Sequence, residues 1–337
     1  MQSTFQKVLG LCVVSALAVA CQPDSAPVQR PETIQPAQPG LPPVPLFNGD
    51  SAYAFVAKQV SFGPRVPGSA EHRACGDWLV EKLEGYGGTV IQQNAEVTIY
   101  NGQKVPMRNI IASWQPEKKE RVLLFAHWDT RPMADQDKEK PNQAIDGAND
   151  GGSGVGVLLE IARQLAAQPA QVGVDIFLTD VEDWGEPHGA MGIGQESYKT
   201  WCLGTQYWVK NPHVPGYKAR FGILLDMVGG KDAQFAKEGW SMRYAAGVVN
   251  KVWKAAAAAG HGNRFLSEVR THVGVDDHVF VNEGLNIPSI DIIAYDAETK
   301  AFPSTWHTHT DNLSNIDKES LQAVGATVAR VVWTERE

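Results

Sequence analysis

The sequence is poor in cysteine and has no excess of basic residues. Only four of its 337 residues are cysteine, and beyond residue 21 only Cys75 and Cys202 remain. Two cysteines cannot build a zinc ribbon or a disulfide framework, and the sequence leaves open whether they pair with each other. The formal net charge is -8, and no basic stripe is present. We therefore expect no nucleic-acid partner.

An apolar run near the N-terminus is too short to span a membrane. It extends from Val8 to Ala20, follows Lys7 and ends at Cys21, which is typical of a signal peptide. Residues 17–21 are similar to a bacterial lipobox, whose cysteine accepts a lipid. The alternative is an ordinary secretory signal with an incidental cysteine. We expect residues 1–20 to be a signal peptide and lipidated Cys21 to anchor the protein to a membrane of the bacterial cell envelope, facing the periplasm or the exterior.

Proline recurs in the segment that follows, at positions 23, 27, 31, 36, 39, 42, 43 and 45. Such segments are extended and semi-rigid. We expect residues 21–50 to form a tether without secondary structure and residues 51–337 to form the folded domain.

Helix and strand patterns alternate in that domain. The predicted helices cover 51–60, 71–86, 154–167, 244–259 and 318–333. The predicted strands cover 89–100, 107–114, 122–126, 174–179, 221–225 and 287–294, and the first two are joined by an Asn101-Gly102 turn that favours a hairpin. Buried strands separated by helices predict an α/β fold, a three-layer α-β-α sandwich with a mostly parallel mixed central sheet. No internal repeat and no glycine-rich phosphate loop is present.

Acidic residues and histidines stand where the predicted strands end. They are His127 and Asp129 after the third strand, Asp180, Glu182 and Asp183 after the fourth, Asp226 after the fifth, Asp150 before a helix, and His307 before the last helix. Ligands of open α/β sheets bind beyond the carboxyl ends of the strands, so we expect these groups to converge. Taken singly, Asp150 could be a turn or helix cap, and His127 could be a histidine at a strand end whose ring nitrogens form ordinary hydrogen bonds. Oxygen and nitrogen donors without a thiolate suit a catalytic zinc.

Several motifs, taken in order, resemble one superfamily. The strings are AHWDTRP, GANDGGSGVGVLLEIAR, LTDVED, LLDMVGG and WHTHTDNLSNID. They resemble the zinc aminopeptidase and glutaminyl cyclase superfamily over residues 50–335. The strings EDWG and WCLGTQYW look like those of the bacterial, Bacteroidetes-type glutaminyl-peptide cyclotransferases.

The resemblance implies roles for individual residues. Asp150, Asp183 and His307 align with the metal ligands, and Glu182 aligns with the general acid/base. The family usually has glutamate where this chain has Asp183, so the backbone there must come closer to the metal. A two-zinc aminopeptidase would use the same three ligands with His127 and Asp226, all of which are present.

Besides the strings EDWG and WCLGTQYW, two further features favour a cyclase over that alternative. Asp276 aligns with an acidic residue that in cyclases hydrogen-bonds to the residue matching Asp226. Phe302 and Trp306 align with the apolar wall that holds the substrate side chain, and the alternative is that they only pack in the core.

The expected activity is conversion of the N-terminal glutamine of a peptide or protein to pyroglutamate, with release of ammonia. One zinc ion would polarise the amide carbonyl, Glu182 would transfer the proton, and Asp226 with Asp276 would orient the reacting groups. A peptide-binding lipoprotein without catalysis is the alternative from another class, but such a protein needs no convergent carboxylates.

Overall fold

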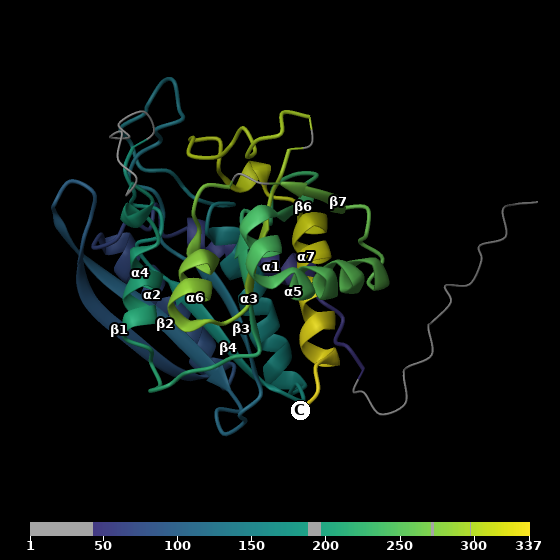
Figure 1. The fold of residues 1–337 in the computed structure, drawn as a ribbon. Coiled ribbons are helices and arrows are strands. Elements are labelled where there is room, and N and C mark those ends of the chain that lie inside the picture. The colour runs from purple at the N-terminus through teal and green to yellow at the C-terminus, as the bar shows by residue number, and fades with distance from the viewer. Residues whose placement is uncertain (1–42, 188–196, 271–272, 297) are drawn as a thin grey trace, which may run out of the picture. The chain divides into compact units, whose positions relative to one another are not determined.

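The computed structural model describes residues 43–187, 197–270, 273–296 and 298–337. Its centre is a six-stranded sheet in the order β1-β2-β4-β3-β5-β8 (Figure 1). The strands are β1 (Thr89–Thr98), β2 (Lys104–Trp114), β3 (Arg121–His127), β4 (Gly173–Thr179), β5 (Phe221–Asp226) and β8 (Ser289–Ile293). β1, β2 and β4 pair antiparallel, whereas β4, β3, β5 and β8 pair parallel. The predicted hairpin and the mostly parallel mixed sheet are thus confirmed.

Seven α-helices occur in the described residues, of which the sequence predicted five. They are α1 (Gly49–Val60), α2 (Ala70–Gly85), α3 (Gly152–Ala167), α4 (Leu203–Lys210), α5 (Gly239–Ala258), α6 (Asp277–Leu285) and α7 (Lys318–Thr334). Side chains of Asn48, Ser69 and Asp317 cap α1, α2 and α7 by accepting backbone N–H groups of the first turn. The sequence missed α4 and α6, and also a small parallel sheet of β6 (Phe235–Glu238) and β7 (Phe265–Arg270).

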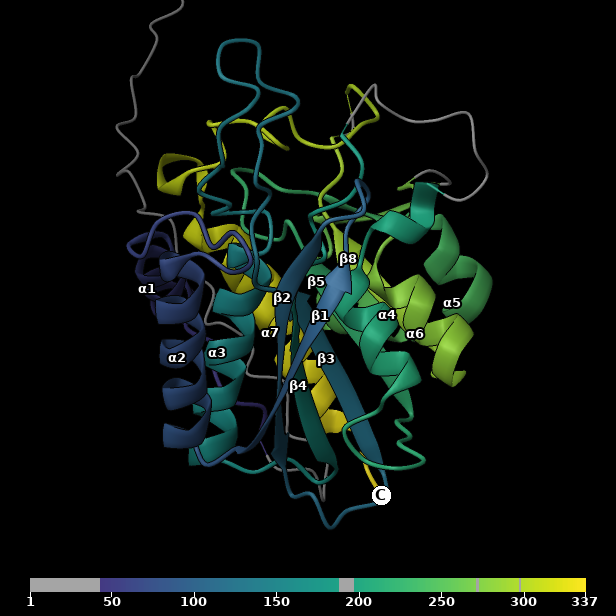
Figure 2. The ribbon, with the colours of Figure 1, turned by 90° about the vertical axis from the view of Figure 1, so that its left-hand side faces the viewer.

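The central sheet is covered on both faces. In β3, Val122, Leu124 and Ala126 pack in the cluster that contains residues of α1, α2, α3 and α7, whereas Leu123 and Phe125 pack with residues of α4 and α6. Figure 2 shows α1, α2 and α3 on one side of the sheet and α4 and α6 on the other. Every residue of β3 is buried, which explains its uninterrupted apolar pattern. The three-layer sandwich is confirmed.

The folded domain begins earlier than the sequence predicted. Phe47 is buried, and its ring lies where a side chain at Gly325 of α7 would stand. Gly49 already belongs to α1. The end of the tether at residue 50 was therefore placed too far along the chain, because one buried aromatic ring fixes the segment on α7. The predicted signal peptide and Cys21 lie outside the described residues, and no described helix is long and apolar enough to cross a membrane.

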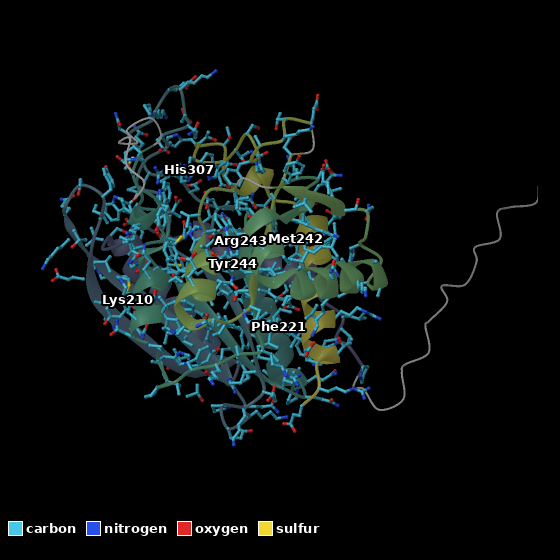
Figure 3. The ribbon with its side chains drawn as sticks, viewed as in Figure 1. Lys210, Phe221, Met242, Arg243, Tyr244 and His307 are labelled. Carbon is cyan, nitrogen blue, oxygen red and sulfur yellow. The ribbon has the colours of Figure 1, made fainter. Side chains whose placement is uncertain are left out.

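The parallel strands place their carboxyl ends at one edge. His127 is in register with Thr179, and Asp226 is in register with Ile293. In Figure 3, His307 lies among the loops at one end of the domain, and Phe221, the first residue of β5, lies towards the other end. Residues that follow the strands are therefore close in space although far apart in sequence.

Candidate active site

The residues that the sequence predicted at the strand ends do meet. His127 ends β3, Asp226 ends β5, Asp183 lies in the loop after β4, and Asp150 lies just before α3. His307 belongs to the segment between β8 and α7. Their donor atoms form two buried groups that share Asp150, and the atoms of each group lie within 4.8 Å of one another.

The first group consists of Asp150, Asp183 and His307. His307 Nε2 lies 3.1 Å from Asp183 Oδ1 and 3.7 Å from Asp150 Oδ2. The three residues are 4%, 1% and 2% exposed. Asp150 Oδ2 and Asp183 Oδ2 are buried without a hydrogen-bond donor.

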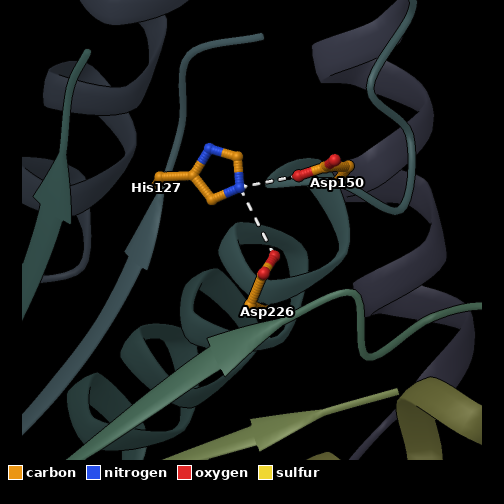
Figure 4. A group of neighbouring side chains, drawn as sticks. All are labelled: His127, Asp150 and Asp226. Atoms are coloured by element: carbon orange, nitrogen blue, oxygen red, sulfur yellow. Dashed lines mark hydrogen bonds and ion pairs between the residues drawn. The ribbon is translucent and has the colours of Figure 1, made fainter. Parts of the chain in front are cut away.

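The second group consists of His127, Asp150 and Asp226 (Figure 4). His127 Nε2 lies 3.0 Å from Asp150 Oδ1 and 3.4 Å from Asp226 Oδ1. Asp150 therefore uses one carboxylate oxygen in each group. The arrangement of the five predicted ligands would allow one cation or two.

The first group fits a zinc ion. Two buried carboxylates side by side repel each other, and Asp150 accordingly raises the pKa of Asp183, beyond the larger rise caused by burial. A divalent cation would relieve that repulsion and use the carboxylate oxygens that have no donor. One imidazole and two carboxylates are zinc donors, and a set of three protein ligands leaves a coordination position open. The residues present therefore fit the metal that the sequence predicts.

The Asp150 loop is held by Asp311, a residue that the sequence did not single out. The Asp311 carboxylate accepts the backbone N–H groups of Asn149 at 2.7 Å and Asp150 at 3.0 Å. Burial raises the pKa of Asp311 to about 7. Gly151 has φ 54°, and a Cβ atom there would lie 2.5 Å from the carbonyl oxygen of His127. The glycine after Asp150 is thus required by the close approach of two backbone segments.

Asp135 and Arg131 hold His307 at the Nδ1 side of its ring. Its Nδ1 atom lies 3.1 Å from Asp135 Oδ1. Arg131 donates Nε and Nη2 to the two oxygens of Asp135, at 2.8 and 2.6 Å. Burial alone would lower the pKa of His307, but the carboxylates of Asp183 and Asp135 outweigh it and raise the pKa to about 9. Such a carboxylate partner orients a ligating imidazole.

Glu182 lies beside the first group, on the loop after β4. Its side chain is 12% exposed and lines the cavity described below. The two oxygens of Asp129 face the backbone N–H groups of Glu182 and Asp183, both at 3.2 Å. Asp129, which the sequence placed among the candidate ligands, therefore anchors this loop. The anchored loop carries the short side chain of Asp183 to the cluster.

The other strand-end candidate, Asp180, faces away from the cluster. Its Oδ1 atom lies 3.0 Å from His72 Nε2, and its Oδ2 atom accepts the backbone N–H of Arg108 at 2.6 Å. Burial raises the pKa of Asp180, as it raises the pKa of Glu182 well above its usual value.

Asp276 lies where α6 begins, next to the second group. Its carboxyl group lies beside that of Asp291 in β8, with one oxygen of each within 4.8 Å of the other. Burial raises the pKa of both residues well above the usual value, and for Asp276 the charge of Asp226 adds to the effect. The structure thus adds Asp291 to the expected network, while the hydrogen bond between Asp276 and Asp226 stays a prediction.

A cavity of about 670 Å³ opens over the cluster. The carboxylates and His307 line one part of it, and aromatic side chains line another, among them Trp201, Phe302 and Trp306. The ring centroids of Phe302 and Trp306 are 4.9 Å apart, and the Trp306 ring stacks on that of His307 with a centroid distance of 3.9 Å. Both predicted wall residues are half-buried, line the cavity and also pack against the main core cluster, so their role in holding the substrate stays a prediction.

The two cysteines of the domain are both buried and free, so they do not pair. Asp135, Asp291, Trp201 and Cys202 were not predicted as site residues. Each contacts the site from a segment distant in sequence, and no local pattern marks such a contact.

Residues 109–332 match the model of peptidase family M28. A glutaminyl cyclase of Bacteroides thetaiotaomicron, solved with N-acetylhistamine, is 51% identical, covers 87% of this chain and all of its own, and has a TM-score of 0.85. A Zn-dependent exopeptidase of Parabacteroides distasonis is 52% identical with the same coverage and a TM-score of 0.83.

Two curated relatives are more distant. The glutaminyl-peptide cyclotransferase of Drosophila melanogaster is 25% identical over 75% of this chain and 72% of its own length. Aminopeptidase YwaD of Bacillus subtilis is 29% identical over 67% of this chain, and the match spans only 44% of that relative. Since the family model matches more than half of the chain and the glutaminyl cyclase matches nearly all of the domain, the chain belongs to peptidase family M28, in the group of its bacterial glutaminyl cyclases.

Proposed function

We propose that the protein is a zinc-dependent glutaminyl-peptide cyclotransferase that converts the N-terminal glutamine of a peptide to pyroglutamate and releases ammonia. One observation carries the proposal. Asp150, Asp183 and His307 meet within 4.8 Å in the wall of a cavity that also contains Glu182 and an aromatic wall. The 51% identity to a glutaminyl cyclase supports the same activity.

Zinc held by Asp150, Asp183 and His307 would supply a Lewis acid for the amide carbonyl of the substrate. The nucleophile is the substrate's own α-amine, which must lose a proton as it attacks. Glu182 lies in the cavity wall next to the ligand Asp183, where it accepts that proton and returns it to the departing nitrogen, so that ammonia leaves.

The aromatic wall positions the substrate. Phe302 and Trp306 stand on the His307 side of the cavity, where they fold the glutamine side chain back towards its own amine. Holding the amine and the carbonyl at attack distance lowers the entropic cost of bringing the two groups together in the transition state. Asp226 and Asp276 line the same cavity and orient the nitrogen atoms of the substrate by hydrogen bonds.

A two-zinc aminopeptidase is the second candidate. The group of His127, Asp150 and Asp226 supports it, because it lies beside the first group and shares Asp150 with it. In that case the second cation would displace the contacts of His127 with the two carboxylates. A solved structure described as a Zn-dependent exopeptidase is 52% identical, but several solved glutaminyl cyclases at 50 to 52% identity give the cyclase the better support.

Three measurements separate the two candidates. The purified protein is treated with a chelator and reloaded with zinc, and bound zinc, ammonia released from a Gln-initiated peptide and leucine released from a Leu-initiated peptide are measured. The cyclase requires about one zinc per chain, ammonia and no leucine. Two zinc ions and leucine release would establish the peptidase.

Glu182→Gln tests the role of the proton-transfer residue. We expect turnover to fall by about 100-fold or more, the effect of losing a general acid/base, while the zinc content stays unchanged because Glu182 is not a ligand. A variant that turns over at the wild-type rate would remove Glu182 from this role.

We also propose that the mature protein is a lipoprotein of the cell envelope, attached through Cys21. The apolar run before Cys21 and the proline-rich segment after it support this. Mass spectrometry of the protein extracted from membranes measures the lipid on Cys21, and an unmodified chain in the soluble fraction would contradict the proposal.

A further inference from the structure

Cys202 lies against the proton-transfer residue. It is the residue before α4, is fully buried, and has the left-handed φ of 57°. Its Sγ atom is 3.2 Å from Glu182 Oε1, which is within hydrogen-bond distance for sulfur. Nothing in the chemistry of cyclisation requires a thiol at this place, so the contact needs another explanation.

The backbone of Cys202 holds the same loop. Its N–H donates to the carbonyl oxygen of Glu182 at 3.0 Å, and the next N–H, of Leu203, donates to the carbonyl of Val181 at 2.9 Å. Val181 also has a positive φ, of 52°. Two non-glycine residues in this sparsely populated region indicate a backbone that its surroundings hold in place. The start of α4 therefore clamps the loop that carries Glu182.

When Glu182 is ionised, the thiol is the donor in their contact. A glutamate that accepts a proton from the substrate must be ionised beforehand, and an ionised carboxylate only accepts hydrogen bonds. Burial and the surrounding carboxylates, Asp277 first among them, raise the pKa of Cys202 well above its usual value, which keeps the sulfur protonated. The S–H group therefore points to Oε1 and leaves Oε2 for other contacts.

A glutamate in a cavity wall needs such a restraint. Its side chain has several rotatable bonds, and each freely populated rotamer lowers the fraction of time that the carboxylate spends in reach of the substrate amine. The other oxygen of Glu182, Oε2, lies 4.0 Å from His127 Nδ1, too far for a hydrogen bond. Among the described residues, Cys202 is therefore the residue whose side chain lies within hydrogen-bond distance of the Glu182 carboxylate.

We propose that Cys202 is a positioning residue for Glu182, whose thiol holds Oε1 so that the other oxygen serves the proton transfer. The inference rests on the proposed role of Glu182. It does not depend on which of the two M28 reactions takes place, because the carboxylate transfers a proton in both.

Serine and alanine provide a matched pair of variants. Both are smaller than cysteine by a similar volume, but only serine retains a donor. We expect Cys202→Ala to lower kcat by about 5- to 10-fold, the effect of one hydrogen bond of ordinary strength, with KM and zinc content unchanged. Cys202→Ser should stay within about 2-fold of the wild type, because the hydroxyl is the stronger donor. Equal losses in the two variants, or a loss confined to KM or zinc content, would overturn the proposal.

A double-mutant cycle tests the route of the effect. In the Glu182→Gln background, Cys202→Ala should cause no further loss of residual turnover, since the residue acts only through Glu182. Independent, multiplicative losses would contradict the proposal.

A measurement without turnover separates this proposal from the proposed function. The infrared S–H stretching band of Cys202 is identified by its absence in Cys202→Ser and is then recorded in Glu182→Ala. Removal of the carboxylate should shift the band to the position of a free thiol. An unshifted band would refute the hydrogen bond even in an active cyclase, whereas a shifted band in a protein without cyclase activity would leave the contact intact and refute only the proposed function.

Discussion

Asp135 is the residue whose removal should most directly weaken zinc binding without removing a ligand. It lies 3.1 Å from His307 Nδ1 and receives two hydrogen bonds from Arg131. In Asp135→Asn an oxygen still faces the imidazole, but the negative charge is lost and only one oxygen remains for the arginine. His307 then becomes less basic and less fixed, while Asp150 and Asp183 keep their positions.

The expected size follows from that contact. Loss of a carboxylate behind a ligating histidine typically lowers metal affinity by about 10- to 100-fold, or about 1.4 to 2.7 kcal/mol. Arg131 adds to the effect, since its Nη1 atom also donates to the backbone carbonyl of Asp183 at 3.1 Å. We therefore expect a value towards the upper end of this range.

Competition with a chromophoric chelator measures the affinity directly and needs no turnover. Asp137→Asn is the matched control, because Asp137 lies on the same loop but bonds His309, at 3.0 Å, and not His307. If Asp135→Asn binds zinc as tightly as the wild type, or if the control loses as much affinity, then Asp135 does not act through His307.

Two further predictions concern stability. Asp175→Ala should lower the free energy of unfolding by about 3 to 5 kcal/mol in urea titrations. In the wild type the buried Arg121 guanidinium donates to both oxygens of Asp175, at 2.6 and 2.7 Å, and the substitution leaves it without this partner. A loss below about 1 kcal/mol would contradict this. Burial raises the pKa of Asp277 to about 7, above its value of about 3.9 in an unfolded chain. As the pH rises from about 4 to 7, the unfolded state loses a proton that the folded state retains, so this residue's contribution to stability falls. Asp277→Asn should abolish that fall and be more stable than the wild type at pH 8 by at most about 4 kcal/mol, and parallel pH profiles of the two proteins would refute the assignment.

Local patterns were sufficient for most of the fold. The elements that the sequence predicted carry strong periodicity or a continuous apolar run, as in β3, where both faces are covered. The missed helix α6 starts with Asp277, and several of its residues are buried acidic or polar groups. Its composition is that of a loop because it packs beside a charged cluster. The end of the tether was misplaced because nothing in the sequence shows that Phe47 finds a partner in α7.

The sequence by itself determined the layer order and the edge of the sheet that carries the site, because both depend on which residues follow which strands. The five candidate ligands came from the resemblance to the family, since the strand ends alone do not separate them from Asp129 and Asp180. Only the tertiary structure decided how those ligands are held. It placed Asp135 behind His307, Asp311 under the Asp150 loop, Asp291 against Asp276 and Cys202 against Glu182. These contacts join segments that no periodic pattern connects, and they form because burying an unpaired charge or a loose carboxylate costs more free energy than ordering its partner.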